Sequence, residues 1–370
     1  MHFSQIIGQD DIKQRLIRSV QDDRIAHAIL LAGNEGIGKL GLALAYAQYV
    51  HCQNPGEKDS CGVCAACHKH RSMVHPDLHF VFPIGKSDRV CDDYLSEWRE
   101  ELLANPYIRR EEWMAALNAP NAPGIIYTKE SDQITKKLNQ KTFEADYKIM
   151  IIWLPERMHE SAANKLLKIL EEPFPKTLII LVSDTPEDII GTILSRTQPL
   201  FVKPIASDIM TATLQQRFSL MEENARAIAD LASGSFARAC ELISVSDESK
   251  LFFDLFVRMM RNSWSRNVKE MKAWTDEVFT LGRERQKNFL NYMLRLIREN
   301  FIYNFRDSRL NYQNRDEADF SVKFARYVNE RNVYSYMEML TLAEQHINQN
   351  VNARMVFFDI SLRITVLLKS

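Results

Sequence analysis

Apolar residues in the first 205 positions gather in short, nearly continuous runs that are separated by stretches of helical periodicity. The runs are rich in β-branched and aliphatic residues and predict strands at 25–33, 78–83, 147–154, 177–184 and 200–202. Helical patterns lie between them, notably at 39–51 and at 161–172, where the second one stops at Pro173. Strands without polar alternation, alternating with helices, predict a parallel sheet covered on both faces.

Beyond Pro204 the pattern is helical. Ser207 is a candidate N-cap for a helix at 208–218, a second short helix is expected at 221–232, and a third from about Ser235, after Gly234. From about Val245 onward we expect only helices. The last of them places these apolar residues on one stripe: Ala353, Val356, Phe357, Ile360, Ile364, Leu367 and Leu368. The predicted fold class is therefore α/β followed by all-α, with the stretch 84–124, rich in charge, Pro and Trp, as an insertion between strands.

The composition narrows the protein class. A chain of 370 residues can form two or three domains, and the formal net charge of −1 gives no global positive field that would attract nucleic acid. The first dozen positions hold acidic residues and lack an apolar core, so we expect no secretory signal. The longest apolar runs are strand-sized. We therefore expect a cytoplasmic protein that has no membrane segment.

A glycine-rich loop follows the first predicted strand and opens a helix. Its sequence from Gly33 to Lys39 is GNEGIGK, in which Gly33, Gly36 and Gly38 let backbone N–H groups close around phosphate oxygens. Lys39 would reach the β- and γ-phosphates. The loop therefore predicts a P-loop, because the motif stands in the strand–helix setting that it requires.

Two features that ATP hydrolysis needs are missing. Position 40 is Leu, where a hydroxyl normally holds Mg²⁺, and a leucine cannot coordinate a hard cation. The strand at 149–152 is followed by Trp153 and Leu154 instead of acids, and we interpret Glu156 as a solvated turn residue. We therefore expect weak binding of ATP or ADP, or none, and no hydrolysis by this chain.

Four cysteines lie within sixteen residues: Cys52, Cys61, Cys64 and Cys67. Two x₂ spacings and four thiolates match a closed, tetrahedral structural zinc site, and a chain without an export signal is not expected to form disulfides. His68 or His70 remains an alternative to one of the sulfurs. Cys91 and Cys240 stand alone and are interpreted as small packing residues.

Arg196 is a candidate for action on a neighbouring subunit. It follows a predicted strand that ends at Ser183, at the sheet edge where phosphate sites lie. A planar guanidinium at such a rim can neutralise charge that builds on the γ-phosphate of a neighbour's ATP. Alone the signal is weak, since an arginine at a helix end is usually solvated or salt-bridged.

Together these motifs resemble the delta-prime subunits of bacterial DNA polymerase III clamp loaders, which are AAA+ proteins. The resemblance covers about residues 1–245 and includes the following segments: Ile7-Gly8-Gln9, Arg24 to Ala28, the P-loop, the cysteine spacing, His75-Pro76-Asp77, Ser161 to Lys168, Leu170 to Pro173, Ser195-Arg196, and Gly234-Ser235 with Arg238. The family pattern has Cys after the arginine, where this chain has Thr197, and the 84–124 segment is longer than the family pattern leads us to expect.

The resemblance implies three domains: an AAA+ P-loop domain at 1–206 with the zinc module at 52–67, a helical lid at 207–245, and a helical collar for oligomerisation at 246–370. It places Ile7 and Gly8 beside the adenine, zinc on the four cysteines, and Arg196 as an arginine finger acting in trans. The implied partners are a gamma/tau-like ATPase and a delta-like subunit, with the sliding clamp and primer–template DNA contacted indirectly.

These motifs bear on three classes of function. A non-hydrolysing clamp-loader subunit agrees with the P-loop, with the missing hydroxyl and acids, and with the cysteine spacing. An active AAA+ ATPase, either a clamp-loader motor subunit or a DNA-repair remodeller, would need a hydroxyl at position 40 and acids at 153 and 154. A zinc hydrolase or deaminase would need an open zinc site with a neighbouring glutamate, which four thiolates oppose.

Overall fold

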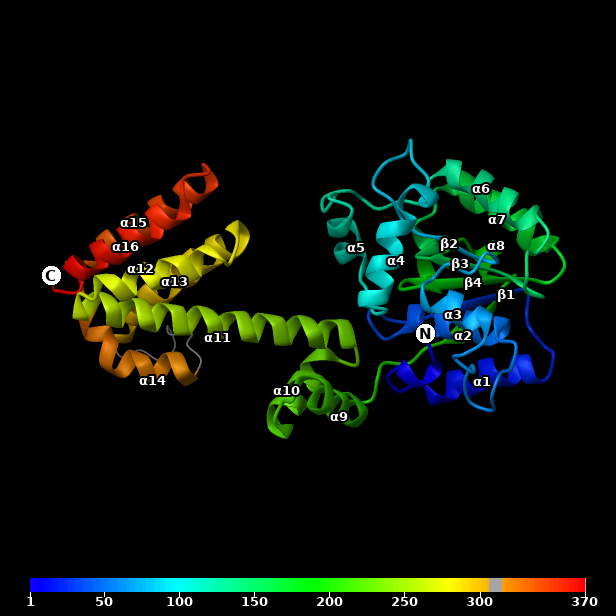
Figure 1. Ribbon diagram of the computed structural model, residues 1–370, viewed down its shortest axis with the longest axis horizontal. Coiled ribbons are helices and arrows are strands. Elements are labelled where there is room, and N and C mark those ends of the chain that lie inside the picture. Colours follow the sequence, from blue (N-terminus) through cyan, green and yellow to red (C-terminus); the bar gives the residue numbers. More distant parts are fainter. Residues whose placement is uncertain (306–314, 370) are drawn as a thin grey trace. The chain divides into compact units, whose positions relative to one another are not determined.

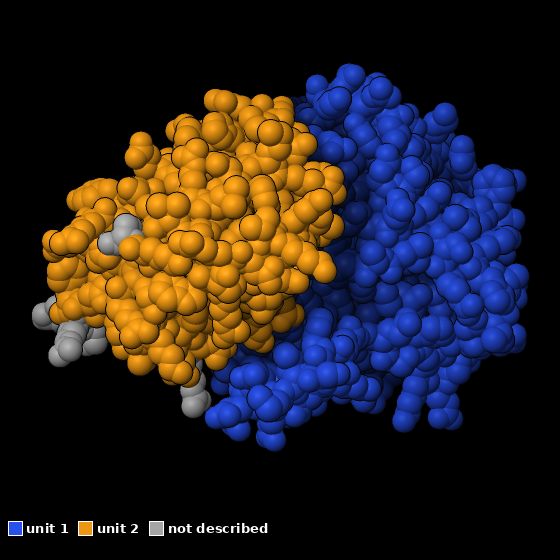
Figure 2. Space-filling view, turned by 60° about the vertical axis from the view of Figure 1, so that its left-hand side comes forward, with its two compact units in different colours: residues 1–243 blue, residues 244–370 orange. Residues whose placement is uncertain are grey.

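The computed structural model describes residues 1–305 and 315–369. The chain divides into two compact units, residues 1–243 and 244–370, coloured blue and orange in Figure 2. Inside the first unit, the buried apolar residues form a large cluster around the sheet and a smaller one around the helices that follow it. The smaller cluster combines residues of the segment that the sequence assigned to a lid with Ile7, Tyr107 and Ile205.

The first unit contains one sheet of five parallel strands in the order β2-β3-β4-β1-β5. The strands are β1 (Ala28–Ala32), β2 (Leu78–Val81), β3 (Lys148–Trp153), β4 (Thr177–Ser183) and β5 (Gln198–Phe201). The three central strands, β3, β4 and β1, are buried along their whole length. This burial explains their continuous apolar runs and confirms the predicted parallel sheet. The predicted ends differ by up to three residues, since fraying ends carry little sequence signal.

Helices lie on both sides of this sheet (Figure 1). They are α1 (Asp10–Gln21), α2 (Lys39–His51), α3 (Ala65–Arg71), α6 (Thr128–Asn139), α7 (Glu160–Glu171) and α8 (Gly191–Leu194). Helix α2 contacts β1, β3 and β4 and is buried on nearly all sides, whereas α7 is amphipathic and buries Ala162, Leu166 and Leu170. The sheet therefore holds the start of α2, and with it the P-loop, in a fixed position.

The 84–124 segment folds into helices α4 (Leu95–Ala104) and α5 (Arg110–Ala116). Its two ends meet, because the backbone groups of Ile84 and Ile125 exchange two hydrogen bonds of 3.0 and 3.1 Å. Trp98 and Trp113 are completely buried, and the indole N–H of Trp113 donates to the carbonyl of Pro83 at 2.8 Å. The predicted insertion is thus part of the domain core and is not a surface loop.

After the sheet, the chain forms α9 (Ser207–Phe218), α10 (Glu222–Ala232) and α11 (Phe236–Ser265). Two sequence expectations are wrong here. Ala206, not Ser207, precedes the first helix, and the Ser207 hydroxyl bonds the Asp230 carboxylate at 2.7 Å. The third helix is not short: its 30 residues run through the boundary expected at 245, because no glycine or proline interrupts it.

The second unit is helical in its described residues. It contains the end of α11 with α12 (Val268–Phe279), α13 (Arg283–Tyr303), α14 (Arg315–Phe324), α15 (Val333–Asn348) and α16 (Ala353–Leu367). The predicted stripe of α16 faces the core at Phe357, Ile360 and Ile364. Among the described residues, no helix has both the length and the apolar character that crossing a bilayer requires.

Candidate functional site

The predicted P-loop connects β1 to α2. Gly36 and Gly38 have φ values of 75° and 95°, which only glycine adopts without strain. At Gly33, a Cβ atom would stand 2.4 Å from the carbonyl oxygen of Val202. The three glycines are therefore required by the conformation of the loop between β1 and α2.

Lys39 is held by groups of its own chain. Its side chain is buried, and the Nζ atom donates to the backbone carbonyls of Gly33, at 2.7 Å, and of Asn34. The same atom pairs with Asp184 Oδ1 at 2.7 Å. Burial raises the pKa of the neighbouring Glu35, and the negative charge of Asp184 adds to that effect. The ammonium group of Lys39 is thus paired with a carboxylate that follows β4.

The residues at the three positions where ATP hydrolysis would need a hydroxyl and acids are part of the apolar core. Leu40, Trp153 and Leu154 are each at most 4% exposed. The Trp153 ring lies 5.1 Å from that of Trp98, which comes from α4 of the inserted segment. An apolar, aromatic environment therefore fills the carboxyl end of β3, where acids would otherwise orient metal and water.

The interpretation of Glu156 as a solvated turn residue is wrong. Its Oε1 atom accepts hydrogen bonds from the backbone N–H groups of Asp184, at 2.8 Å, and Thr185, at 3.2 Å. Burial raises the pKa of this carboxyl, although those N–H donors oppose the shift. Glu156 ties the turn after β3 to the end of β4, a long-range role that its local sequence could not reveal.

The two residues expected beside a nucleotide base, Ile7 and Gly8, lie at the small apolar cluster. Ile7 is buried, and a Cβ atom on Gly8 would be 3.7 Å from the side chain of Ile209. The backbone N–H of Ile7 donates to the hydroxyl of Tyr107 at 3.0 Å. Tyr107 belongs to the inserted segment, and nothing in the sequence pattern had pointed to it.

The helices after the sheet touch the P-loop directly. The carbonyl of Gly36 accepts the backbone N–H of Phe236 at 2.9 Å, and a Cβ atom on Gly36 would lie 2.4 Å from Ser235 Oγ. Gly234 was expected only to separate two helices and to be part of the family resemblance. Its φ of 81° makes this turn possible.

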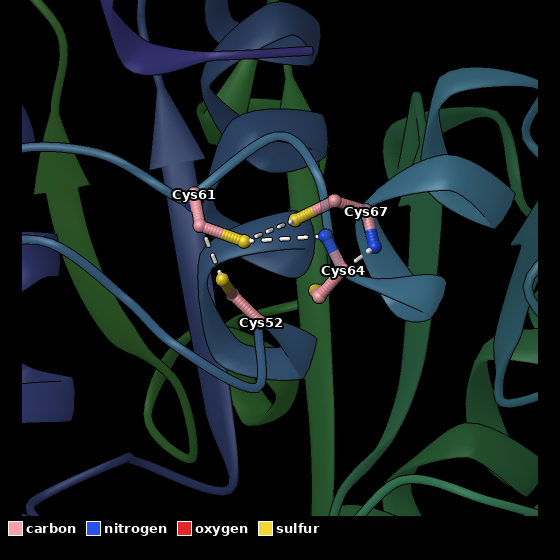
Figure 3. Close-up of side chains that lie close together, drawn as sticks. All are labelled: Cys52, Cys61, Cys64 and Cys67. Carbon is pink, nitrogen blue, oxygen red and sulfur yellow. Dashed lines mark hydrogen bonds between the residues drawn. The ribbon is translucent and has the colours of Figure 1, made fainter.

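The four predicted cysteines converge between α2 and α3 (Figure 3). Their sulfur atoms lie within 4.8 Å of one another, and the Sγ atoms of Cys61 and Cys67 are 3.9 Å apart. A tetrahedral zinc with bonds of about 2.3 Å sets sulfurs about 3.8 Å apart, so these residues fit the ion. His68 is exposed and His70 turns towards His51, so within the described residues the cluster is made of thiols.

Backbone N–H groups point at three of the sulfurs. Cys61 N donates to Cys52 Sγ at 3.2 Å, Cys64 N to Cys61 Sγ at 3.4 Å, and Cys67 N to Cys64 Sγ at 3.5 Å. The N–H groups of Val63 and Cys64 lower the pKa of Cys61 to about 6, whereas burial raises the pKa of Cys52 and Cys67. Such donors stabilise thiolates, which are the form that ligates zinc.

A buried group of three histidines stands beside the cysteines and was missed by the sequence reasoning. His51 Nδ1 lies 2.9 Å from His70 Nε2, and His51 Nε2 donates to the carbonyl of Tyr147 at 2.8 Å. His75 Nδ1 accepts the backbone N–H of Asp77 at 3.2 Å. Burial lowers the pKa of His51 to about 3 and that of His70 to about 2. These neutral rings join α2, α3 and the start of β2.

Arg196 follows the short helix α8 and is 35% exposed. Its guanidinium pairs with Glu171 at 2.7 Å and donates to the carbonyl of Thr192 at 3.0 Å. The side chain is therefore accessible but held by the last turn of α7. Of the predicted site residues, Ile7 contacts Tyr107, which packs against Gly38 of the P-loop, and the four cysteines form a cluster of their own.

This fold and these motifs define a P-loop module of the AAA+ kind followed by helices. The sequence model of the family described as "DNA polymerase III, delta subunit" matches residues 8–206, more than half of the chain. The chain belongs to this family.

Individual relatives agree. The chain is 29% identical over 240 residues to DNA polymerase III subunit delta' of Bacillus subtilis, a match that covers 65% of this chain and 60% of that protein. It is 25% identical over 229 residues to the Escherichia coli subunit delta', covering 62% and 58%. The matches thus span less than two thirds of these relatives.

A solved structure of a DNA polymerase III gamma subunit-related protein from Thermotoga maritima covers 97% of this chain and 100% of its own, with 15% identity and a TM-score of 0.38. Neither that identity nor that TM-score bears on function.

Proposed function

We propose that this protein is a delta-prime-like clamp-loader subunit of DNA polymerase III that does not hydrolyse ATP. In this role it assembles with a gamma/tau-like ATPase and a delta-like subunit, and helps the assembly load a sliding clamp onto primed DNA. Membership of the delta family and the similarity to proteins named subunit delta' support the role. Its three domains would be a P-loop domain, a lid and a collar that holds the ring together.

The observation that carries the loss of hydrolysis is the apolar character of the catalytic positions. Leu40 offers no oxygen to Mg²⁺, and Trp153 and Leu154 stand where acids would orient metal and water. Restoring one residue would not restore the chemistry, because Trp98 also packs against Trp153. Steady ATP turnover by the purified chain, abolished by Lys39→Ala, would instead support the alternative, an active AAA+ ATPase.

Arg196 is the residue that we propose acts on a neighbour. Its guanidinium would leave Glu171 and approach the γ-phosphate on an adjacent ATPase subunit, where it would neutralise charge in the transition state. The ion pair with Glu171 is half exposed, so giving it up costs little, about 0–1 kcal/mol. Glu171 would thus keep the arginine ordered in the free subunit without locking it.

The test is the DNA-stimulated ATPase of a loader reconstituted from this chain and its gamma/tau-like and delta-like partners. Arg196→Ala should leave assembly intact and lower turnover by about 10- to 1000-fold, with arginine-finger effects as the upper guide. Arg196→Lys should recover only part of the rate, because an ammonium lacks the planar fork.

Two further variants separate this role from general damage. Glu171→Ala removes the intramolecular partner of Arg196 and should leave turnover within a few fold of wild type. Arg226→Ala, on the exposed face of α10, serves as the matched control for loss of an arginine. Unchanged turnover with Arg196→Ala in a fully assembled loader would remove Arg196 from the mechanism.

We further propose that zinc on the four cysteines has a structural role. Four thiolates leave no open position for water or substrate, so the ion would add stability rather than chemistry. It would fix the loop between α2 and α3, to which the chain's first residues are also tied: Asp59 accepts the backbone N–H groups of Phe3 and Ser4 at 3.1 and 2.9 Å.

A further inference from the structure

Tyr107 packs against the P-loop from the inserted segment. A Cβ atom on Gly38, the last loop residue before α2, would lie 2.9 Å from the Cε1 atom of the Tyr107 ring. The ring is 3% exposed, and its hydroxyl accepts a hydrogen bond from the backbone N–H of Ile7. Tyr107 therefore occupies a hydrogen-bond donor, the Ile7 N–H, and the apolar surface beside Gly38. Without Tyr107, both would be available to a flat ligand ring that has polar atoms at its edge.

The same ring is covered on its other side. Phe236, at the start of α11, lies 4.9 Å from Tyr107 between ring centroids, and Arg217 stands 5.2 Å from the centroid of Phe236. Two residues further on, Arg109 pairs with Glu241 at 2.9 Å and also with Glu112 at 3.1 Å. The turn between α4 and α5 thus joins the P-loop to the helices that follow the sheet.

The phosphate side of the loop is also occupied by the chain itself. Lys39 is bound to Asp184 and to two backbone carbonyls, as described above. A nucleoside phosphate bound at this loop would have to displace the Asp184 carboxylate from Lys39 and the Tyr107 ring from Gly38. Its nucleoside would extend along the wall formed by Gly38, Ile7 and Phe236, which Tyr107 already covers.

We propose that the chain itself occupies the nucleotide position: Tyr107 of the 84–124 segment takes the place of the nucleoside, while Asp184, which follows β4, takes that of the terminal phosphate. The module then keeps a closed arrangement of P-loop and lid without any nucleoside diphosphate or triphosphate. This inference rests on the proposal that the chain does not hydrolyse ATP, and it is independent of the role of Arg196.

Trp98 supports the same conclusion from the opposite side of the segment. It stacks on Phe82 at 4.3 Å and contacts Trp113 and Trp153, so α4 is anchored in the domain core. An occupant anchored in this way is present at high effective concentration and competes with a free ligand without dissociating. Because the two ends of the segment are joined and its tryptophans are buried, Tyr107 stays in its position against the P-loop.

The experiment is a titration of the full chain with ADP and with ATP–Mg²⁺, followed by calorimetry and by a fluorescent ADP analogue. Wild type should bind only in the millimolar range or more weakly. Tyr107→Ala frees the wall and the Ile7 N–H and should bind ADP at least about tenfold more tightly. Adding Asp184→Asn should tighten binding further, and adding Lys39→Ala should abolish the gain.

Matched controls test whether the ring itself is responsible. Tyr107→Phe keeps the ring and should remain closed to nucleotide like wild type. Tyr94→Ala removes a tyrosine from the same segment without touching the P-loop glycines, and should also behave like wild type. Tyr107→Leu keeps apolar contact with Phe236 and offers a milder variant should Tyr107→Ala unfold, with zinc content and the melting curve as the readouts of folding.

Micromolar binding of ADP by wild type would overturn the proposal. So would a folded Tyr107→Ala or Tyr107→Leu protein without any gain in affinity. Hydrogen exchange of wild type adds a measurement that needs no variant: micromolar ADP should leave the exchange of residues 105–109 unchanged, and protection or release there would contradict a permanent occupant. None of these results depends on the loader ATPase, so failure here and failure of the Arg196 mechanism are distinguishable.

Discussion

Asp77 is expected to be one of the most important single carboxylates for the stability of the first unit. It precedes β2 and is 1% exposed. Its Oδ1 atom accepts the backbone N–H of Phe143 at 2.7 Å, and its Oδ2 atom accepts those of Glu144 and Ala145, both at 3.0 Å. The carboxylate thereby holds the loop before β3 against the start of β2.

The size of the effect follows from these three bonds. Hydrogen bonds to a charged acceptor contribute about 1.5–3 kcal/mol each. Residues 143 and 144 are exposed, so water can reach the loop after the change and recover part of that free energy. We therefore expect Asp77→Asn to lower the free energy of unfolding by about 2–4 kcal/mol, since the amide group would face two N–H donors without accepting from them.

The pH dependence has a definite sign. Burial alone would raise the pKa of Asp77, but the N–H bonds from Glu144, Phe143 and Ala145 outweigh it, and the pKa in the folded protein is lowered. A lowered pKa means that the stabilisation is fully present above the unfolded value of about 3.9 and is lost as the pH falls through the folded pKa. The difference between wild type and Asp77→Asn should therefore be constant near neutral pH and shrink under strongly acidic conditions.

The assay is hydrogen exchange at increasing urea concentration, read from peptides that cover β2 and β3, so that unfolding of the second unit does not contribute. Asp146→Asn is the matched control: Asp146 lies in the same loop, is 85% exposed and pairs only across the surface with Lys176 in the described contacts. It should change stability by about 0–1 kcal/mol. Equal effects of the two substitutions would refute the reasoning.

Two other predictions concern the zinc cluster and the P-loop. The purified protein should contain about one zinc per chain, and Cys61→Ser with Cys64→Ser should release it and lower the melting temperature; a fully folded, metal-free protein would contradict the zinc site. Gly36→Ala should destabilise the protein by about 1–3 kcal/mol, because φ is 75° and the new Cβ would lie 2.4 Å from Ser235 Oγ. Gly191→Ala meets nothing within 4 Å and should have little effect on the melting temperature, so equal losses would count against the steric argument.

Much of the α/β fold and the grouping of the four cysteines could be predicted because their signals are local. The helix at 39–51 could be predicted to the residue, since a glycine-rich loop opens it and its burial makes it largely apolar. The cysteine spacing alone grouped four residues that the structure brings within 4.8 Å. The P-loop likewise depends on seven consecutive residues.

Tertiary contacts decided the remainder of the site. Tyr107 reaches Ile7 across one hundred positions, Asp184 reaches Lys39, and the three histidines come from different elements. Such pairings depend on how the helices pack on the sheet, and no periodicity of 2 or 3.6 residues encodes them. The sequence by itself therefore determined that a P-loop and a cysteine cluster are present, whereas the packing of the 84–124 segment decided what lies against that loop.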